Sequence, residues 1–233
     1  MSFARSILTA AAAASVALGA APALADTIPL TAANVGQSYT LNYNGFSDGT
    51  TINGLTASTT FTLTQINGND YTFSYSLTNT TSDPVNSRVS SFGFNTNPDI
   101  TSASSTGAFS YTTLNSSYPN GIGAIDVCFK DASTGSCSGG GSGGLTDGQT
   151  GTGTFTLSFA QPVSSLTLGD FYVRYQSITG AGNISSASGS GSLTSTGSSG
   201  GSVPEPGMVG LLGGALIATA FLRRRRNPAL APA

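Results

Sequence analysis

The sequence of 233 residues contains no histidine and no tryptophan, and only 8% of its residues are charged, against roughly 25% in an ordinary globular domain. Without histidine, a Ser–His–Asp triad and a histidine-ligated metal are excluded. Glu205 is the only glutamate, and half of the eight basic residues form one run near the C-terminus. The middle of the chain has too few basic residues to neutralise phosphates, so nucleic-acid binding is excluded as well.

The first 25 residues have the three parts of a secretory signal peptide. Arg5 supplies a positive n-region, residues 7–19 an apolar h-region, and Ala23 and Ala25 a small-x-small cleavage site before Asp26. The alternative, a buried alanine-rich helix, would not usually end in Ala-x-Ala followed by a polar, threonine-rich stretch. We expect signal peptidase to cut after Ala25, so that the mature chain begins at Asp26 outside the inner membrane.

A short apolar segment near the C-terminus ends in a positive cluster. Residues 207–222 carry no charge, and Arg223, Arg224, Arg225 and Arg226 follow at once. Sixteen helical residues rise about 24 Å against a hydrocarbon core of about 30 Å, which suits a transient anchor better than a permanent one. The arginines are expected to stop translocation and to hold the C-terminus in the cytoplasm. The alternative, a buried amphipathic helix, needs a polar face that this segment lacks.

The motif Val203, Pro204, Glu205 and Pro206 stands immediately before the apolar segment. This motif, a short apolar helix and an arginine cluster, in this order, resemble the PEP-CTERM sorting signal of Gram-negative bacteria. The resemblance covers residues 203–226 and implies cleavage near the Pro-Glu-Pro by exosortase, an integral-membrane enzyme. It also implies a transient inner-membrane anchor, final placement at the cell surface or in the extracellular matrix, and a producer of exopolysaccharide and biofilm. Residues 227–233 depart from the pattern, in which the chain ends close to the arginines.

The body between these ends alternates in hydrophobicity as β-strands do. Large side chains alternate with Thr, Ser or Asn over residues 39–43, 60–64, 71–77 and 154–159, and residues 171–175, rich in aromatic residues, are a fifth strand candidate. This period of two predicts antiparallel sheet with one solvated face. The predicted fold class is all-β, an antiparallel β-sandwich or jelly roll, flanked by a signal-peptide helix and a short C-terminal transmembrane helix.

Composition divides the chain into five parts. Residues 1–25 form the signal peptide, 26–184 the exported β domain, 185–202 a Ser/Gly-rich linker, 203–226 the sorting signal and 227–233 a short tail. The linker is expected to be a random coil that holds the domain clear of the membrane. The glycine run at 139–144 is expected to be a flexible loop, because it lacks the Lys-Ser/Thr pair that follows phosphate-binding loops.

Cys128 and Cys137 are the only cysteines. An isolated even pair in an exported protein predicts a disulfide, whereas a redox or metal site would need a CxxC spacing or histidine. The glycine-rich stretch 137–144 after 125–129, together with 73–94 and 171–178, is similar to the cistern group of PEP-CTERM proteins. That group has no assigned activity, so this resemblance bears on identity more than on function.

Aspartate is the only acidic residue type in the body. Nothing in the sequence pairs two carboxylates as in a glycosidase or spaces them as in an EF-hand. We therefore expect no catalytic residue, no metal site and no cofactor, although calcium held by scattered loop oxygens stays an alternative. The predicted function is that of a non-enzymatic surface or matrix protein with exopolysaccharide as its partner.

Other functions stay open beside this one. The first is a carbohydrate-binding module, calcium-assisted or not, in which Tyr111, Tyr118 or Tyr172 forms a stacking platform; the absence of tryptophan disfavours strong stacking. More remote are a carboxylate glycosidase and an ice-binding protein, the latter disfavoured because we expect no regularly spaced Thr-x-Thr rungs. Arg88 and Arg174 are expected to pair with aspartates at the surface, with contact to an acidic sugar as the alternative.

Overall fold

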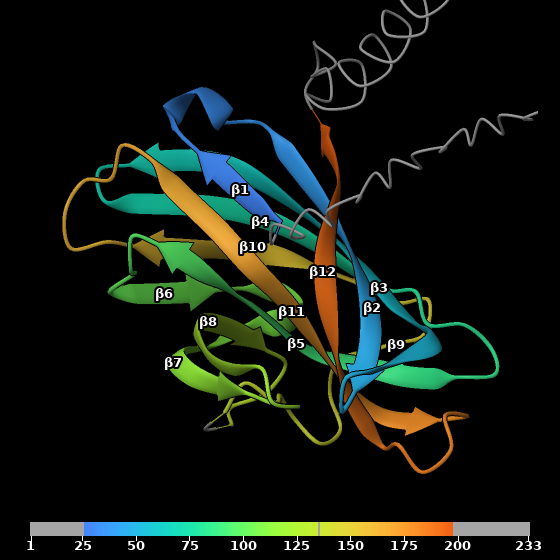
Figure 1. Ribbon diagram of the computed structural model, residues 1–233. Helices are drawn as coiled ribbons and strands as arrows, with labels where there is room; N and C mark the ends of the chain where they lie inside the picture. The colour runs from blue at the N-terminus through green and yellow to red at the C-terminus, as the bar shows by residue number, and fades with distance from the viewer. Residues whose placement is uncertain (1–25, 135, 198–233) are drawn as a thin grey trace, which may run out of the picture.

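The computed structural model describes residues 26–134 and 136–197, which form one antiparallel sheet (Figure 1). The predicted signal-peptide helix, transmembrane helix and sorting motif lie outside these residues. The elements are β1 (Thr27–Leu30), η1 (Ala32–Asn34), β2 (Ser38–Ser47), β3 (Thr50–Asn67), β4 (Asp70–Asn79), β5 (Asn86–Asn97), β6 (Ser102–Ser105), η2 (Gly107–Phe109), β7 (Tyr111–Tyr118), β8 (Gly123–Lys130), β9 (Leu145–Thr146), β10 (Thr150–Ser158), β11 (Leu166–Thr179) and β12 (Ser186–Gly197). None of the helices in the described ranges is long and apolar enough to cross a membrane.

The sheet curls until its two ends meet. Its strand order is β6-β10-β4-β3-β2-β12-β11-β5-β8-β7, with β1 paired to β11 and β9 to β5. The end strands β6 and β7 are consecutive in the chain and are joined through η2, so the sheet is nearly closed into a barrel (Figure 1). The all-β antiparallel prediction is confirmed. The sandwich or jelly-roll architecture is corrected to a single sheet, because bulges in β2, β3, β11 and β12 increase its twist and coiling.

Aromatic side chains fill the interior of the barrel. All five segments predicted as strands lie in strands, apart from Phe159, and their large residues are buried. The Phe155 ring lies 5.6 Å from Phe61 and 4.8 Å from both Phe73 and Phe129, measured between centroids. Rings from strands on opposite sides therefore meet at the centre. An interior side chain also holds the connection between the end strands β6 and β7. The Tyr75 hydroxyl donates to the Thr106 carbonyl at 2.9 Å and accepts from the Phe109 amide at 3.0 Å.

Strand β12 corrects the predicted linker at 185–202. It lies in the middle of the sheet, hydrogen-bonded to β11 on one side and to β2 on the other. A Cβ atom on Gly189 would lie 2.8 Å from the Tyr175 ring, and one on Gly191 would lie 2.6 Å from the Tyr43 ring. Because rings from both neighbouring strands cover β12, only small residues fit there. A Ser/Gly run that has the composition of a linker is thus a central strand, and residues 198–202 lie outside the described part.

Candidate functional site

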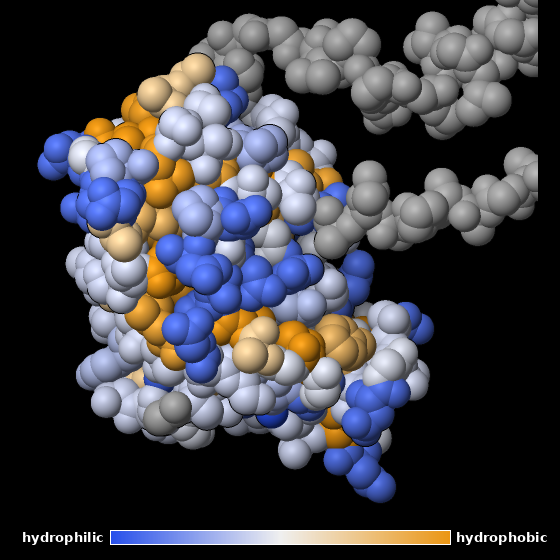
Figure 2. Space-filling model, turned by 60° about the vertical axis from the view of Figure 1, so that its left-hand side comes forward, coloured by the Kyte–Doolittle hydropathy of each residue, from blue (hydrophilic) through white to orange (hydrophobic). Residues whose placement is uncertain are grey.

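Five neighbouring strands present an uncharged outer surface rich in hydroxyl groups. The strands are β2, β3, β4, β10 and β6, and their inward neighbours form the core. We call this surface the hydroxyl face. Most of its outward residues are Ser, Thr or Asn: Ser38, Thr40, Asn42, Asn44, Thr56, Ser58, Thr60, Thr62, Thr64, Thr72, Ser74, Ser76, Thr78, Ser102, Ser104, Thr150, Thr152, Thr154, Thr156 and Ser158. Near the β3–β4 turn, Gln65 and Asp70 are in register with Thr72 and Ser158 and depart from this composition. Figure 2 shows the pale colours of weakly hydrophilic residues over much of the view, with strongly hydrophilic residues gathered in a few places.

Strand register sets these side chains in rows. One row joins Thr40, Thr60, Ser76 and Thr152 across four strands. Hydroxyl groups hydrogen-bond across the strands within such rows, at 3.0 Å between Thr40 and Thr60 and between Thr72 and Thr156. Successive residues within a row belong to neighbouring strands, which lie about 4.8 Å apart. Each paired hydroxyl keeps lone pairs toward solvent, so the face offers a two-dimensional array of hydrogen-bonding groups without charge.

The rows correct one expectation from the sequence. Regularly spaced Thr-x-Thr rungs were expected to be absent, yet Thr150, Thr152, Thr154 and Thr156 alternate along β10. The alternating inward residues of β10 include Phe155 and Leu157, which are buried. The Thr-x-Thr pattern is therefore the outer half of an ordinary strand pattern. It forms a surface only because β4 and β3 bring equivalent residues alongside.

A shallow hollow lies within the hydroxyl face over β2 and β3. It has a volume of about 280 Å³ and is lined by Asn42, Asn44, Thr56, Ser58 and Thr80, with Tyr43 and Ala57 contributing from the strands themselves. A hydroxyl–hydroxyl bond of 2.9 Å from Thr80 to Thr56 fixes one wall. Two amides and three hydroxyls around one hollow provide both donors and acceptors, which is the chemistry that recognises a neutral polyol.

The opposite outer face is covered by loops and contains the buried charges. Arg88 on β5 and Asp131 form an ion pair with 3.7 Å between Nη1 and Oδ2, and their side chains are 10% and 3% exposed. The Arg88 guanidinium also donates to the Gly140 carbonyl at 3.2 Å and to Gln176 Oε1 at 3.1 Å. The Gly140 amide in turn donates to Asp131 Oδ1 at 2.5 Å.

The glycine run packs closely around this ion pair. A Cβ atom on Gly143 would lie 2.6 Å from Asp131 Oδ2, and one on Gly139 would lie 2.3 Å from the Ser90 carbonyl oxygen. The run was expected to be a flexible loop, but close contacts leave no room for a Cβ atom at Gly139, Gly140, Gly143 and Gly144, whereas Gly141 has open space. Cys128 and Cys137 form the predicted disulfide beneath it, both fully buried, with 5.8 Å between their Cα atoms.

Two other cations are buried without forming an ion pair within the described residues. The Lys130 amine donates to Thr113 Oγ1 at 2.5 Å and to the Thr134 carbonyl. Burial lowers the pKa of Lys130, and the charge of Asp131 partly opposes the shift. The Arg174 guanidinium donates to the Asn120 side-chain oxygen at 3.2 Å, and burial lowers its pKa. The prediction of surface pairing with aspartate is wrong for Arg174, whereas Arg88 does pair with an aspartate, in a buried position.

The predicted tyrosine platform does not form. Tyr118 is 1% exposed, and its ring packs 5.6 Å from that of Tyr172 between centroids. Tyr111 is 45% exposed but stands on the edge strand β7. The sequence predicted a solvated sheet face with Thr and Ser on it, from the strict alternation in β4 and β10. It could not predict which strands share that face, because no single segment contains it.

The aspartates are dispersed over turns, strand ends and, for Asp126 and Asp170, the interior of strands. Asp126 Oδ2 accepts the Thr96 amide at 2.7 Å, and Asp147 Oδ1 accepts the Ser87 amide at 3.0 Å. In the described ranges no three His, Cys, Asp or Glu side chains gather as a group that could hold a metal ion. These carboxylates therefore satisfy backbone amides in the positions where the structure places them.

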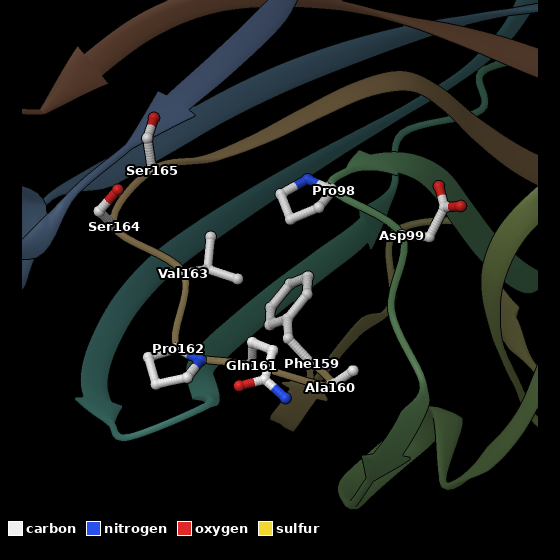
Figure 3. A pocket seen from close by; sticks show the side chains of 9 residues that line it. All are labelled: Pro98, Asp99, Phe159, Ala160, Gln161, Pro162, Val163, Ser164 and Ser165. Carbon is white, nitrogen blue, oxygen red and sulfur yellow. The ribbon is translucent and has the colours of Figure 1, made fainter.

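A second hollow lies at one end of the barrel, between the β5–β6 and β10–β11 loops (Figure 3). Its volume is about 390 Å³, and it is lined by Pro98, Asp99, Phe159, Ala160, Gln161, Pro162, Val163, Ser164 and Ser165. Pro98, Phe159 and Val163 surround its centre, while the polar side chains stand at its margin (Figure 3). The Tyr71 hydroxyl donates to the Val163 carbonyl at 2.8 Å and fixes the loop.

Fold and site define a disulfide-linked all-β domain with one loop-covered face and one uncharged polar face. The comparisons with known proteins place this domain in a sorted protein. The pattern of the PEP-CTERM protein-sorting motif matches residues 202–226. The chain therefore carries this sorting motif at 202–226, which implies processing by exosortase and export to the membrane or cell surface. No curated protein and no solved structure matches it, and the match at 202–226 gives no support to the narrower likeness to the cistern group.

Proposed function

We propose that the exported barrel is a non-enzymatic component of the cell surface or extracellular matrix that associates with neutral exopolysaccharide through its hydroxyl face. The observation that carries this proposal is the composition of the face, in which Ser, Thr and Asn are the great majority of the outward residues on five neighbouring strands. The C-terminal sorting motif, which implies export, supports the proposal because an exported domain can meet exopolysaccharide outside the cell.

The chemistry of the face favours an uncharged glycan over other partners. Protein interfaces are depleted in serine and enriched in aromatic residues, and the hydroxyl face has the reverse composition. Nucleic acids and acidic glycans need basic residues, which the face lacks. Ice presents a flat lattice, whereas the strands of a nearly closed barrel are twisted and curved. A flexible neutral polymer follows such a surface, and its hydroxyl groups exchange hydrogen bonds to water for hydrogen bonds to the protein.

The hollow at Asn42 and Asn44 is the place where a sugar ring is held most closely. An amide provides a donor and an acceptor side by side, which matches adjacent hydroxyls of a sugar. The cation-free, carboxylate-poor surroundings make this a binding surface, and we propose no catalytic role for it. Loss of two neutral hydrogen bonds costs about 2 kcal/mol, which corresponds to roughly a thirtyfold loss in affinity.

Sedimentation with polysaccharide tests this function. We expect the purified barrel to sediment with extracellular polysaccharide extracted from the producing cells and with an insoluble neutral glucan. The double variant Asn42→Ala, Asn44→Ala should bind at least tenfold more weakly. The matched control Asn86→Ala, Asn183→Ala, which changes two exposed asparagines outside the hydroxyl face, should bind as the wild type does. Absence of wild-type binding, or equal loss in both variants, would refute the proposal.

A further inference from the structure

The position of β12 leaves very little chain between the folded barrel and the sorting motif. The last residue of β12 is Gly197, and the Val-Pro-Glu-Pro motif begins at Val203. Residues 198–202 span at most about 20 Å even when fully extended. A linker spanning residues 185–202, as the composition predicted, would have allowed the barrel to lie far from an enzyme that binds the motif. An enzyme that holds residues 203–206 therefore lies within about 20 Å of Gly197.

Both ends of the mature chain are attached to this strand. Gly197 pairs with Ser38 at the start of β2, and the Asp26 carboxylate accepts the Leu193 amide at 2.8 Å. Asp26 is the residue expected to follow signal-peptide cleavage. Three residues separate Leu193 from Gly197, so Asp26 and the last residue of β12 lie in one region of the barrel.

Register shows which loops surround that region. The start of β2, the β3–β4 turn, the end of β10 and the start of β11 lie at the same end of the barrel, because Ser38 pairs with Thr62 and Ser158 pairs with Asp70. We call it the loop end; it contains η1 with residues 31–37 and the β10–β11 loop at 159–165. In Figure 1, η1 and the tip of β12 lie at the top of the view, and the β10–β11 loop lies at its left-hand side.

The surface of the loop end suits a protein partner. It carries the hollow of about 390 Å³ whose centre is formed by Pro98, Phe159 and Val163. Val35, in the loop 31–37 of the same end, is 44% exposed. The loops 31–37 and 159–165 contain no basic residue, so they offer no attraction to anionic lipid headgroups. An apolar hollow with a polar margin is instead typical of a protein contact.

We propose that the loop end docks on the exported surface of exosortase while the sorting motif occupies that enzyme. The short spacer forces the contact, and the hollow between Pro98 and Val163 receives the enzyme surface. The substrate of sorting is then the folded barrel presented in one orientation, with the β2–β3 turn and the β11–β12 loop pointing away. This inference is independent of the proposed association with polysaccharide.

Site-specific photo-crosslinking in membranes containing exosortase tests the proposal. We expect p-benzoylphenylalanine at Val35 or Gln161, both on the loop end, to crosslink the full-length chain to the enzyme. The same probe at Asp48 or Asn183, at the opposite end, should give at least tenfold less product. A probe at Ser202, next to the motif, is the positive control for occupancy of the enzyme.

A spacer variant separates docking from general proximity. Insertion of twenty Gly/Ser residues after Ser199 adds an r.m.s. reach of about 25 Å, and it should lower crosslinking from Val35 at least fivefold while the Ser202 product persists. Equal crosslinking from both ends of the barrel, or none from the loop end while Ser202 reacts, would overturn the proposal. Undiminished crosslinking from Val35 after the insertion would overturn the role of the spacer.

Discussion

The purified barrel is expected to lose stability steeply above pH 10. Tyr43, Tyr118 and Tyr175 are almost completely buried, and burial raises the pKa of each well above its ordinary value of 10. In the unfolded chain these phenols ionise near pH 10, whereas in the folded chain they stay protonated. The folded state then binds more protons, so the free energy of unfolding falls by about 1.4 kcal/mol per pH unit for each tyrosine, or about 4 kcal/mol for the three.

Lys130 contributes with the opposite sign over a lower range. Its lowered pKa means that the unfolded chain binds more protons between the folded-state pKa and 10.5, so stability rises with pH across that window and the gain is complete above it. Above that window the tyrosines dominate the pH dependence of the free energy of unfolding. Denaturant titrations followed by circular dichroism from pH 8 to pH 11.5, with tyrosinate absorbance recorded in parallel, measure the slope.

Tyr175→Phe is the matched variant for this prediction. The Tyr175 hydroxyl is buried and has no hydrogen-bond partner within the described residues. Its removal should leave the protein as stable or about 1 kcal/mol more stable at neutral pH, and should reduce the alkaline slope by about one third. If wild-type stability changed little between pH 9 and pH 11.5, the burial of these phenols would be contradicted.

Asp131→Asn is expected to destabilise the barrel by about 3 kcal/mol. The substitution keeps the size of the side chain and an oxygen for the Gly140 amide, but it leaves the charge of Arg88 without its counter-ion in a site where both side chains are nearly buried. Breaking a buried pair by removing one partner costs about 3–5 kcal/mol, and the three neutral acceptors around Arg88 keep the loss at the lower end.

Two further variants show whether loss of the Asp131 charge causes the expected destabilisation. Asp48→Asn, in the exposed β2–β3 turn, should change the free energy of unfolding by less than about 0.5 kcal/mol. The double variant Arg88→Met, Asp131→Leu should be more stable than Asp131→Asn, because it removes both charges together. Urea unfolding at pH 7 measures all three. If Asp131→Asn and Asp48→Asn proved equally stable, the ion pair would have no structural role.

The sequence predicts strands wherever one face of the sheet is wet. In β4 and β10 the buried and hydroxyl residues alternate strictly, so their period is visible without any structure. Strand β5 was not predicted, because loops cover its outer face and residues 87–94 are buried on both sides. Strand β12 was misassigned for the opposite reason, since rings from β2 and β11 restrict it to the small residues typical of a linker.

Sequence alone identifies the sorting motif, but it does not identify the surface that several strands of the barrel form together. Residues 203–206 and the arginines that follow form a linear signal, so residue types and their order suffice to identify it. The hydroxyl face depends on which strands become neighbours: Thr152 lies beside Ser76 only because β10 pairs with β4 across more than seventy residues of chain. Composition showed many hydroxyl residues, but only the register shows that they form one surface.

Intact mass of the protein recovered from the cell surface and from the medium, with and without exosortase, tests the central claim most directly. The account predicts a chain that begins at Asp26, ends near Pro204–Pro206 only when exosortase is present, and lacks the two hydrogens lost in the Cys128–Cys137 disulfide. A mass that retains residues 207–233 in cells containing exosortase would make the tail a plain anchor and would contradict the sorting account.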